Sequence, residues 1–393
     1  MRILFLSTWF PYPPSNGSKQ RVFNLLRSVA AQHEVTLLSL GDLAEADLRP
    51  PELGALCRRI EVFPLKPFAA HSWRGHLRAA PRSIVGTYSE EMAQRLRAMV
   101  ATERYDVLVA SQLLAASYVP CCGGLPALYE EVELGLLYEQ LARAASLLQR
   151  SRHGLTWLKH RFYLARLLRS FRACTVVSER ERQLLDLAAP QHPPITIIPN
   201  AVNLADYADV HETPRPNQLI FAGSLGYSAN YDAMSWFVRE VYPLIRARVP
   251  DVQLTITGDA ANRPLPPAPN VVQTGYVEDV RPLVAGAWIS VVPIRMGGGT
   301  RVKILEAMAL GTPVVSTSKG AEGLEVTNDA HLLIADTPQL FAQHVVRLLR
   351  DADLRSRLAR RARELVASRY TWSVIGPRFA QLAADIAQPG TVP

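Results

Sequence analysis

Residues 297–316 read GGGTRVKILEAMALGTPVVS, and they form the most informative pattern in the chain. A glycine-rich loop leads into a helical pattern whose first turn carries Arg301 and Lys303, followed by Glu306, a second glycine turn and an apolar strand. Backbone N–H groups and two cations at a helix start suit phosphate oxygens, and a carboxylate one turn along can accept both hydroxyls of a ribose. The stretch therefore predicts a site for a nucleotide diphosphate.

Short apolar strands alternate with helical patterns on both sides of this stretch. Strand, crossover helix and strand in this order predict parallel sheets with helices on both faces. The predicted strands are 3–6, 34–40, 62–65, 107–110, 127–129 and 175–177 in the first half, and 218–222, 252–257, 271–274, 289–293 and 313–316 in the second.

A proline-rich junction at 190–194 separates the two halves. The chain has 393 residues, which exceeds the size of one ordinary hydrophobic core. We therefore expect an α/β protein with two doubly wound domains, 1–193 and 194–370. The helical pattern at 371–387 has no strand after it, so we expect it to pack elsewhere.

Composition narrows the class of protein further. Hydrophobic residues make up 48% and charged residues 20%, which favours globular domains over disorder. No apolar stretch approaches the roughly 20 residues that span a bilayer. The apolar start MRILFLSTWF runs into Pro11 without a small-residue cleavage site, so it indicates a first strand and a cytoplasmic protein.

Glycines follow several predicted strands, where doubly wound sheets bind ligands. They include Gly17 in the first loop, Gly223 with Ser224 after strand 218–222, and Gly258 after strand 252–257. Neither GxGxxG nor GxxxxGK[ST] occurs, so a nicotinamide-binding domain and a P-loop kinase have no support. Each glycine taken alone is equally compatible with an ordinary turn.

The stretch 297–316 resembles the donor-binding signature of GT-B glycosyltransferases of family 4, also called glycosyl transferases group 1. That signature reads LLEAMAxGxPVV, and this chain has ILEAMALGTPVV at 304–315. The preceding GGGTRVK is similar to a subgroup of the exopolysaccharide type. Residues 198–203 (IPNAVN) resemble the family's IPNGVD, 370–372 (YTW) its YSW, and 11–17 with Arg21 its glycine-bearing loop.

The resemblance implies two Rossmann-like domains facing each other across a cleft, with residues 1–193 binding the acceptor and 194–370 the donor. Residues 371–393 would pack back on the first domain. The enzyme would move a hexose from a nucleotide diphosphate sugar, such as a UDP-sugar, to a hydroxyl of a glycan or lipid-linked acceptor in polysaccharide biosynthesis. Family members retain the anomeric configuration and need no metal, so no cofactor and no metal ligand are expected.

Site residues follow from the resemblance, position by position. Glu306 would bind the ribose, and Arg301 and Lys303 would stabilise the leaving diphosphate. The implied donor-binding residues are Gly17, Gly223, Ser224, Gly258, Tyr276, Val277, Gly298, Gly299, Thr300, Arg301, Lys303, Ile304 and Glu306.

Three departures from the family pattern concern catalysis. Gly298 stands eight residues before Glu306, where members commonly have a second glutamate. Residues 224–230 offer neither the Arg nor the Lys that usually follows Gly223, which leaves Arg301 and Lys303 as substitutes. Gln112 stands where many members have a histidine, so Gln112, Glu130 and Glu131 are the candidates for the acceptor-side group, against the alternative of an ordinary strand end.

Basic residues concentrate in the first half, with 24 Lys/Arg against 17 Asp/Glu in residues 1–190. Residues 143–172 hold eight of these cations and no acid, interleaved with leucines and aromatics. The stretch is compatible with a solvated helix face or with an anionic membrane surface, which would make the protein peripheral at the inner face of the membrane. Nucleic acid is excluded as a partner because no nucleic-acid module accompanies the charge.

Two alternative functions stay open from the sequence. A nucleotide-sugar epimerase uses the same domains, but it would need carboxylates near the sugar. A catalytically degenerate protein would bind the nucleotide sugar and neither transfer nor hydrolyse it. The sequence leaves the donor base, the acceptor and the linkage undetermined.

Overall fold

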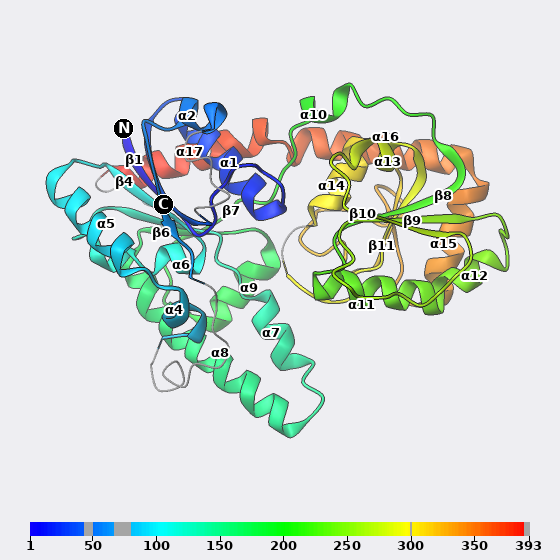
Figure 1. The fold of residues 1–393 in the computed structure, drawn as a ribbon, viewed down its shortest axis with the longest axis horizontal. Helices are drawn as coiled ribbons and strands as arrows, with labels where there is room; N and C mark the ends of the chain where they lie inside the picture. Colours follow the sequence, from blue (N-terminus) through cyan, green and yellow to red (C-terminus); the bar gives the residue numbers. More distant parts are fainter. Residues whose placement is uncertain (43–49, 67–79, 299–300, 389–393) are drawn as a thin grey trace. The chain divides into compact units, whose positions relative to one another are not determined.

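The computed structural model describes residues 1–42, 50–66, 80–298 and 301–388. It divides into two compact units: unit 1 comprises Met1–Pro199 with Ile375–Pro393, and unit 2 comprises Asn200–Val374. Each unit is a parallel sheet covered by helices, as Figure 1 shows. The fold is therefore α/β with two doubly wound units.

Unit 1 is built on a seven-stranded sheet in the order β3-β2-β1-β4-β5-β6-β7 within its described residues. The strands are β1 (Arg2–Ser7), β2 (Glu34–Gly41), β3 (Arg59–Pro64), β4 (Val107–Ser111), β5 (Ala127–Glu130), β6 (Ala173–Val176) and β7 (Ile195–Ile197). The helices are α1 (Gly17–Ala30), α2 (Pro51–Leu56), α4 (Arg82–Thr87), α5 (Glu90–Thr102), α6 (Gln112–Ala116), α7 (Gly135–Ala142), α8 (Leu147–Leu167), α9 (Glu179–Ala188) and α17 (Trp372–Ala387).

The central strand β1 pairs in parallel with a neighbouring strand on each side and is buried on both faces. Ile3 pairs with Val35 on one side and with Val107 on the other, and residues 3–6 are fully buried. A strand that is apolar on both faces requires helices on both faces, which is the arrangement of a doubly wound sheet.

The boundary between the units falls later than the predicted division after residue 193. Strand β7 pairs with β6 through Cys174 opposite Ile195, so residues 195–197 complete the sheet of unit 1. The proline-rich junction therefore precedes the last strand of unit 1, and the chain leaves that unit after Pro199.

Helix α17 joins the far end of the chain to unit 1. A Cβ atom on Gly376 would lie 2.3 Å from Oγ of Ser28 on α1, so the two helices touch with no room for a side chain. Arg172 donates from Nη1 to the carbonyl oxygen of Ile386 at 2.9 Å.

Unit 2 is built on a six-stranded parallel sheet in the order β10-β9-β8-β11-β12-β13 within its described residues. The strands are β8 (Arg215–Ala222), β9 (Gln253–Thr257), β10 (Val271–Gly275), β11 (Ala287–Val292), β12 (Val314–Ser316) and β13 (Leu333–Ile334). The helices are α10 (Ala205–Ala208), α11 (Ser228–Trp236), α12 (Tyr242–Arg246), α13 (Arg281–Ala285), α14 (Val302–Ala309), α15 (Pro338–Arg350) and α16 (Ala352–Arg369).

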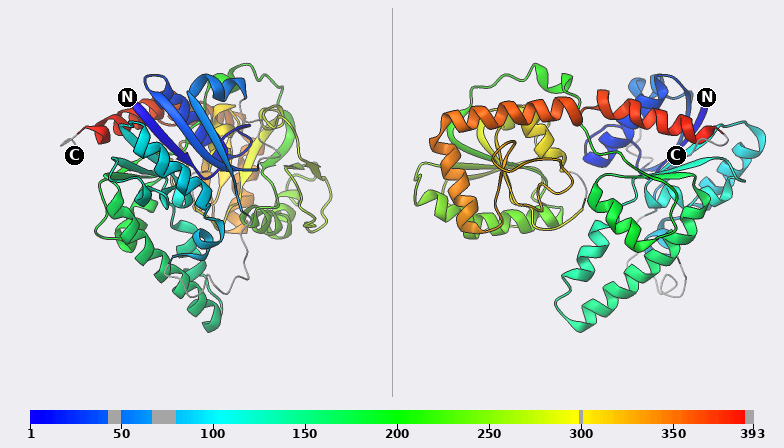
Figure 2. Two further views of the ribbon diagram at one scale, coloured as in Figure 1. Left: turned by 60° about the vertical axis from the view of Figure 1, so that its left-hand side comes forward. Right: turned by 180° about the vertical axis from the view of Figure 1, so that it is seen from behind.

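Residues 302–316 form helix α14 and strand β12 in the core of unit 2. Helix α14 buries Ile304, Leu305, Ala307 and Met308 in the core, and β12 pairs with β11 through Val314 opposite Ser290. Between them Gly311 turns the chain with a φ of 75°. Figure 2 shows the helices that cover both faces of this sheet.

Candidate functional site

Two loops at the carboxyl ends of β8 and β9 form the floor of the candidate site in unit 2. Gly223 and Gly258 follow these strands with φ values of 153° and 102°. A Cβ atom on Gly258 would lie 2.6 Å from the backbone nitrogen of Ser224, so the two loops meet through bare backbone. Only glycine permits both this approach and these torsions.

Lys303 stands over this floor. Its Nζ donates to Oδ1 of Asn230 at 3.0 Å and lies 4.2 Å from the ring centre of Phe221. A Cβ atom on Gly223 would come within 2.6 Å of the same nitrogen. Burial, and then the charge of Arg301, lowers the pKa of Lys303 to about 7, while Glu306 acts in the opposite direction. A partly buried lysine of this kind favours an incoming polyanion, which would restore its charged form.

Arg301 stands directly before helix α14, and its side chain turns back onto the preceding loop. Its guanidinium donates to the carbonyl oxygens of Gly297 and Gly298 at 2.6 Å each, and to that of Met296 at 3.3 Å. These bonds tie the glycine-rich loop to the residue that directly precedes α14. The structure thus supports a positioning role for Arg301, and Lys303 is the cation that faces the floor.

Glu306 lies one turn beyond Lys303 on α14. Tyr207 donates its hydroxyl hydrogen to Oε1 of Glu306 at 3.4 Å. Burial raises the pKa of the Glu306 carboxyl, whereas Lys303 and the Tyr207 hydrogen bond lower it. A partly buried carboxylate with one weak donor has acceptor capacity left for the hydroxyls of a ribose.

The remaining predicted donor residues fall into three groups. Ser224 is part of the floor, since its Oγ accepts from the backbone of Gly226 and donates to the carbonyl of Asp259. Tyr276 and Val277 follow β10, whose last residue, Gly275, accepts from the Gly258 backbone nitrogen at 2.8 Å. The side chain of Tyr276 is 77% exposed.

The third group consists of Gly298, Gly299, Thr300 and Ile304, and no side chain that the structure describes among them is assigned to a ligand surface. The side chain of Ile304 lies wholly in the core, so only its backbone can face a ligand. Gly298 is described and accepts from Arg301. Gly299 and Thr300, both predicted to face the donor sugar, lie outside the described residues.

A second polar cluster lies at the carboxyl ends of β4 and β5 in unit 1. Gly17 begins α1, and Arg21 follows one turn later with its guanidinium buried. Arg21 donates from Nε to Oε1 of Glu130 at 2.7 Å and from Nη2 to the Ile198 carbonyl at 2.8 Å. Ser111 donates to the other oxygen of Glu130 at 2.6 Å. Both oxygens of Glu130 are therefore engaged in structural bonds.

Gln112 and Glu131 complete this cluster and differ from Glu130. Each directly follows a strand and adopts the left-handed backbone, with φ values of 70° and 61°. Gln112 donates from Nε2 to Oε2 of Glu131 at 2.9 Å. Burial raises the pKa of Glu131 to about 8, and Arg21, whose Nε lies 3.7 Å from Oε1 of Glu131, opposes that shift. Non-glycine residues held in this region are frequent at functional sites.

The sequence did not assign a site role to Asn230 and Tyr207. Asn230 holds Lys303 and also donates to the Ser224 carbonyl at 2.8 Å, so it links the helix to the floor. It lies in the segment after Gly223, where the family pattern has cations and an amide carries no signal of its own. No local pattern marks Tyr207, which reaches Glu306 from 99 residues away.

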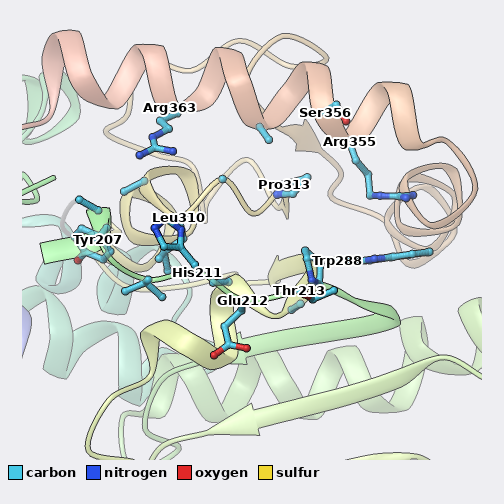
Figure 3. A pocket seen from close by; sticks show the side chains of 18 residues that line it. Tyr207, His211, Glu212, Thr213, Trp288, Leu310, Pro313, Arg355, Ser356 and Arg363 are labelled. Atoms are coloured by element: carbon cyan, nitrogen blue, oxygen red, sulfur yellow. The ribbon is translucent and has the colours of Figure 1, made fainter. Parts of the chain in front are cut away.

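A cavity of about 640 Å³ lies elsewhere in unit 2 (Figure 3). Its lining comes from the segment before β8, the starts of β11 and β12, and helix α16, and in it Arg355 lies 4.0 Å from the ring centre of Trp288. These are amino ends of strands, opposite the edge where doubly wound sheets bind ligands. We therefore place the candidate site at Lys303, and not in this cavity.

Metal ligation and membrane crossing have no structural counterpart in the described parts of the chain. The described residues contain no cluster of three His, Cys, Asp or Glu side chains arranged to hold an ion. Among the same residues, no helix combines the length and the apolar character that crossing a bilayer requires.

Two doubly wound units, one of them with a glycine floor under Lys303, form the architecture of GT-B proteins. The models of two protein families match the chain, "Glycosyl transferase 4-like domain" over residues 16–201 and "Glycosyl transferases group 1" over residues 216–351. The chain therefore belongs to the GT-B glycosyltransferase family of the group 1, family 4-like type.

Individual relatives agree with this assignment. Over 152 residues the chain is 30% identical to an uncharacterised 44.6 kDa protein in the cps region of Klebsiella pneumoniae, covering 36% of this chain and 38% of that protein. It is also 30% identical over 149 residues to the lipopolysaccharide core biosynthesis glycosyltransferase LpsE of Rhizobium meliloti (strain 1021), covering 35% and 44%. The matches thus span less than half of either curated relative.

The fold is shared along almost the whole chain with a solved structure. Anabaena Alr3699/HepE, crystallised with UDP and glucose, superposes with a TM-score of 0.67 over 98% of this chain and 99% of that one, at 16% identity. This likeness establishes the GT-B fold predicted from the sequence.

Proposed function

We propose that the protein transfers a hexose from a nucleotide diphosphate sugar to a hydroxyl group of a glycan or lipid-linked acceptor. The observation that carries the proposal is the ammonium of Lys303, held by Asn230 over the bare backbone of Gly223. That arrangement supplies one positive charge and a close backbone approach at the sheet edge suited to a diphosphate.

The donor would bind along this edge. The diphosphate would lie on the floor next to Lys303, and the ribose hydroxyls would be accepted by the carboxylate of Glu306. Tyr276 and Val277 would lie beside the base. UDP is the first nucleotide to test, because HepE was crystallised with UDP.

In the proposed reaction the bond between the anomeric carbon and the diphosphate oxygen breaks, and a bond from the acceptor oxygen to that carbon forms. Lys303 would stabilise the charge that develops on the leaving diphosphate, and Arg301 would hold the glycine-rich loop at the sugar. We propose retention of configuration and no requirement for a metal, since the leaving charge has a cation of the chain to meet it.

The acceptor hydroxyl must also lose a proton, and the ionised form of Glu131, which is the minority form below its pKa of about 8, is the proposed group that takes it. Its Oε2 accepts from Gln112, while its Oε1 lies 3.7 Å from Nε of Arg21, beyond hydrogen-bonding distance. Glu130, by contrast, accepts a short hydrogen bond on each of its two oxygens. Gln112 is thereby assigned the positioning of Glu131, in place of a direct catalytic role.

We propose the location of the enzyme in the cell from the basic residues of unit 1. A lipid-linked acceptor is presented at a membrane whose cytoplasmic surface is anionic. The basic stretch 143–172 would draw a cytoplasmic, peripheral enzyme to that surface.

The test begins with donor binding measured by calorimetry for UDP, GDP, ADP and their sugars, with EDTA and with Mg²⁺. We expect one nucleotide to bind without metal, and the Lys303→Met variant to bind it at least tenfold more weakly. Transfer is then assayed with the selected nucleotide sugar and glycan or lipid-linked acceptors. Binding without transfer to any acceptor would favour the degenerate binder, and interconversion of the free nucleotide sugar would favour the epimerase.

A further inference from the structure

Helix α8 presents a row of apolar side chains to solvent. Leu147, Leu148 and Phe162 are 85%, 82% and 71% exposed, and Leu155 and Leu158 are exposed between them. At 3.6 residues per turn these five residues fall within roughly 100° of the helix circumference. We call this set the α8 apolar row.

The opposite side of α8 packs against unit 1, so the exposed apolar row is not the side of the helix that forms the core. Trp157, Leu164 and Leu167 are buried on the opposite side, and the Trp157 ring lies 5.7 Å from the Tyr138 ring of α7. Figures 1 and 2 show α7 and α8 as a hairpin that extends away from the sheet of unit 1. The exposed row thus lies on the side of α8 opposite to the one that packs on unit 1.

Cations border the apolar row. Arg152, Lys159 and Arg166 follow it along one border and Arg150 along the other, at the angles that 3.6 residues per turn gives. Arg161 also falls on the second border, but its Nε donates to the carbonyl oxygen of Ala188 at 3.2 Å, so it is held against unit 1. No acidic residue occurs between Glu139 and Glu179. An exposed apolar stripe between two basic borders matches a lipid surface with anionic headgroups, in both hydrophobicity and charge.

We propose that α8 lies in the plane of an anionic lipid surface, with Leu147, Leu148, Leu155, Leu158 and Phe162 inserted among the acyl chains and the bordering cations on the headgroups. This goes beyond a general attraction of basic residues, because it requires insertion of apolar side chains. It rests on the proposed function in one point only: a lipid-linked acceptor would explain why the enzyme binds such a surface. Binding of lipid itself requires no nucleotide sugar.

A protein partner is the less favoured occupant. Protein hot spots seat their anchors in well-packed pockets, and partners of calmodulin type enclose such a helix in a groove. Here the helix is already packed on unit 1 along one side and bears its leucines on the exposed side, which a deformable lipid layer can cover.

The experiment is flotation of the full chain with vesicles of phosphatidylcholine alone and with about 30% phosphatidylglycerol, a composition that supplies anionic headgroups. We expect the protein to float with the anionic vesicles and to remain below with the neutral ones. The Leu148→Gln/Leu155→Gln/Phe162→Gln variant should partition at least tenfold less. The matched control, Val272→Gln/Leu340→Gln, removes exposed apolar side chains from unit 2 and should float like the wild type.

A second variant tests insertion directly. Phe162→Trp should show a blue-shifted emission and quenching by brominated acyl chains when anionic vesicles are added. Flotation that the triple variant leaves unchanged, or emission from the Phe162→Trp variant that bromine never quenches, would overturn the proposal. A self-associating face is also measurable: if sedimentation shows a wild-type dimer that the triple variant dissociates, with no vesicle binding, the row is an interface between copies and the proposal is wrong.

Calorimetry with the nucleotide separates this proposal from the previous one. The triple variant should bind nucleotide as the wild type does, since its changes lie in unit 1 on exposed positions. Vesicle binding without any nucleotide binding would refute the transferase proposal and support the proposed lipid-binding role of α8. Nucleotide binding without vesicle binding would refute the lipid-binding proposal and leave the transferase proposal standing.

Discussion

Nζ of Lys303 lies so close to Gly223 that a Cβ atom at residue 223 would come within 2.6 Å of it. Asn230 holds the ammonium from the side at 3.0 Å, so the cation is fixed above the backbone and not extended into solvent. This contact explains why a lysine and a glycine 80 residues apart in the chain must be considered as one unit. Burial lowers the pKa of Lys303 to about 7, so we expect nucleotide binding at this lysine to depend on pH.

Donor affinity should fall as the pH rises through about 7, the value to which burial lowers the pKa of Lys303. The ammonium is needed for the diphosphate, and the charged fraction drops about tenfold per pH unit above the pKa. We expect the Kd of a nucleotide sugar to be flat near pH 6 and to rise by several-fold between pH 7 and 8.5. Calorimetry on the wild type and on Lys303→Met checks this, because the variant should bind weakly with no such slope.

Glu306→Ala should weaken nucleotide binding by about tenfold to a hundredfold, the range of one or two hydrogen bonds to a charged acceptor. Glu306→Gln keeps the volume and one acceptor oxygen, so its loss should be smaller. Titration of both variants with the same nucleotide provides the measurement. Equal affinity in wild type and Glu306→Ala would show that the ribose lies elsewhere.

Arg301→Ala should reduce turnover more than donor affinity, because the guanidinium ties the loop carbonyls of residues 296–298 to the start of α14. Arg301→Lys should fail to restore the rate, since a single ammonium does not reproduce the spread of donors that a guanidinium offers three carbonyls. Comparison of kcat with KM in the two variants distinguishes this positioning role from direct charge stabilisation, for which lysine would rescue much of kcat.

The stability of the protein should decline with rising pH partly because of Glu131. Its folded pKa of about 8 exceeds the ordinary value of 4.5, so the folded state holds a proton that the unfolded state has released between these values. The unfolding free energy therefore falls as the pH rises from 4.5 through 8. Urea denaturation at pH 6 and pH 8.5 should show a smaller decline for Glu131→Gln than for the wild type.

Two glycines of unit 2 form a matched test of close backbone approach. Gly258→Ala should lower the unfolding free energy by about 3 kcal/mol or more, because its methyl group would meet the backbone of Ser224 in addition to the strain of a positive φ. Gly311→Ala has a φ of 75° but open space around it, so it should cost only about 1 kcal/mol. Denaturant titration of both variants gives the comparison, and equal costs would contradict the contact between the loops.

Much of the fold was predictable from the sequence because buried parallel strands read as continuous apolar runs. Strands β1, β8 and β11 were predicted within a few residues for that reason. Strand β13, with two residues, is too short for any such pattern. The break between α7 and α8 was not predictable either, since the turn at 143–146 has neither glycine nor proline to mark it.

The candidate site was predictable only where glycines and charges stand next to strand ends. Gly223, Gly258, Lys303 and Glu306 fall on or beside one edge in this way. The direction of a side chain was not predictable: Arg301 turns back on its own loop, and Asn230, an ordinary helical amide in the sequence, positions the lysine. Such choices depend on which carbonyl lies within reach after folding.

Helix α17 has a consequence for the order in which the molecule is made. Its glycine at 376 packs on Ser28, yet all of unit 2 is synthesised between these two residues. During translation unit 2 emerges as one continuous segment and can fold while unit 1 still lacks its last helix. The unit whose synthesis starts first is thus completed last, because its final helix follows all of unit 2 in the chain.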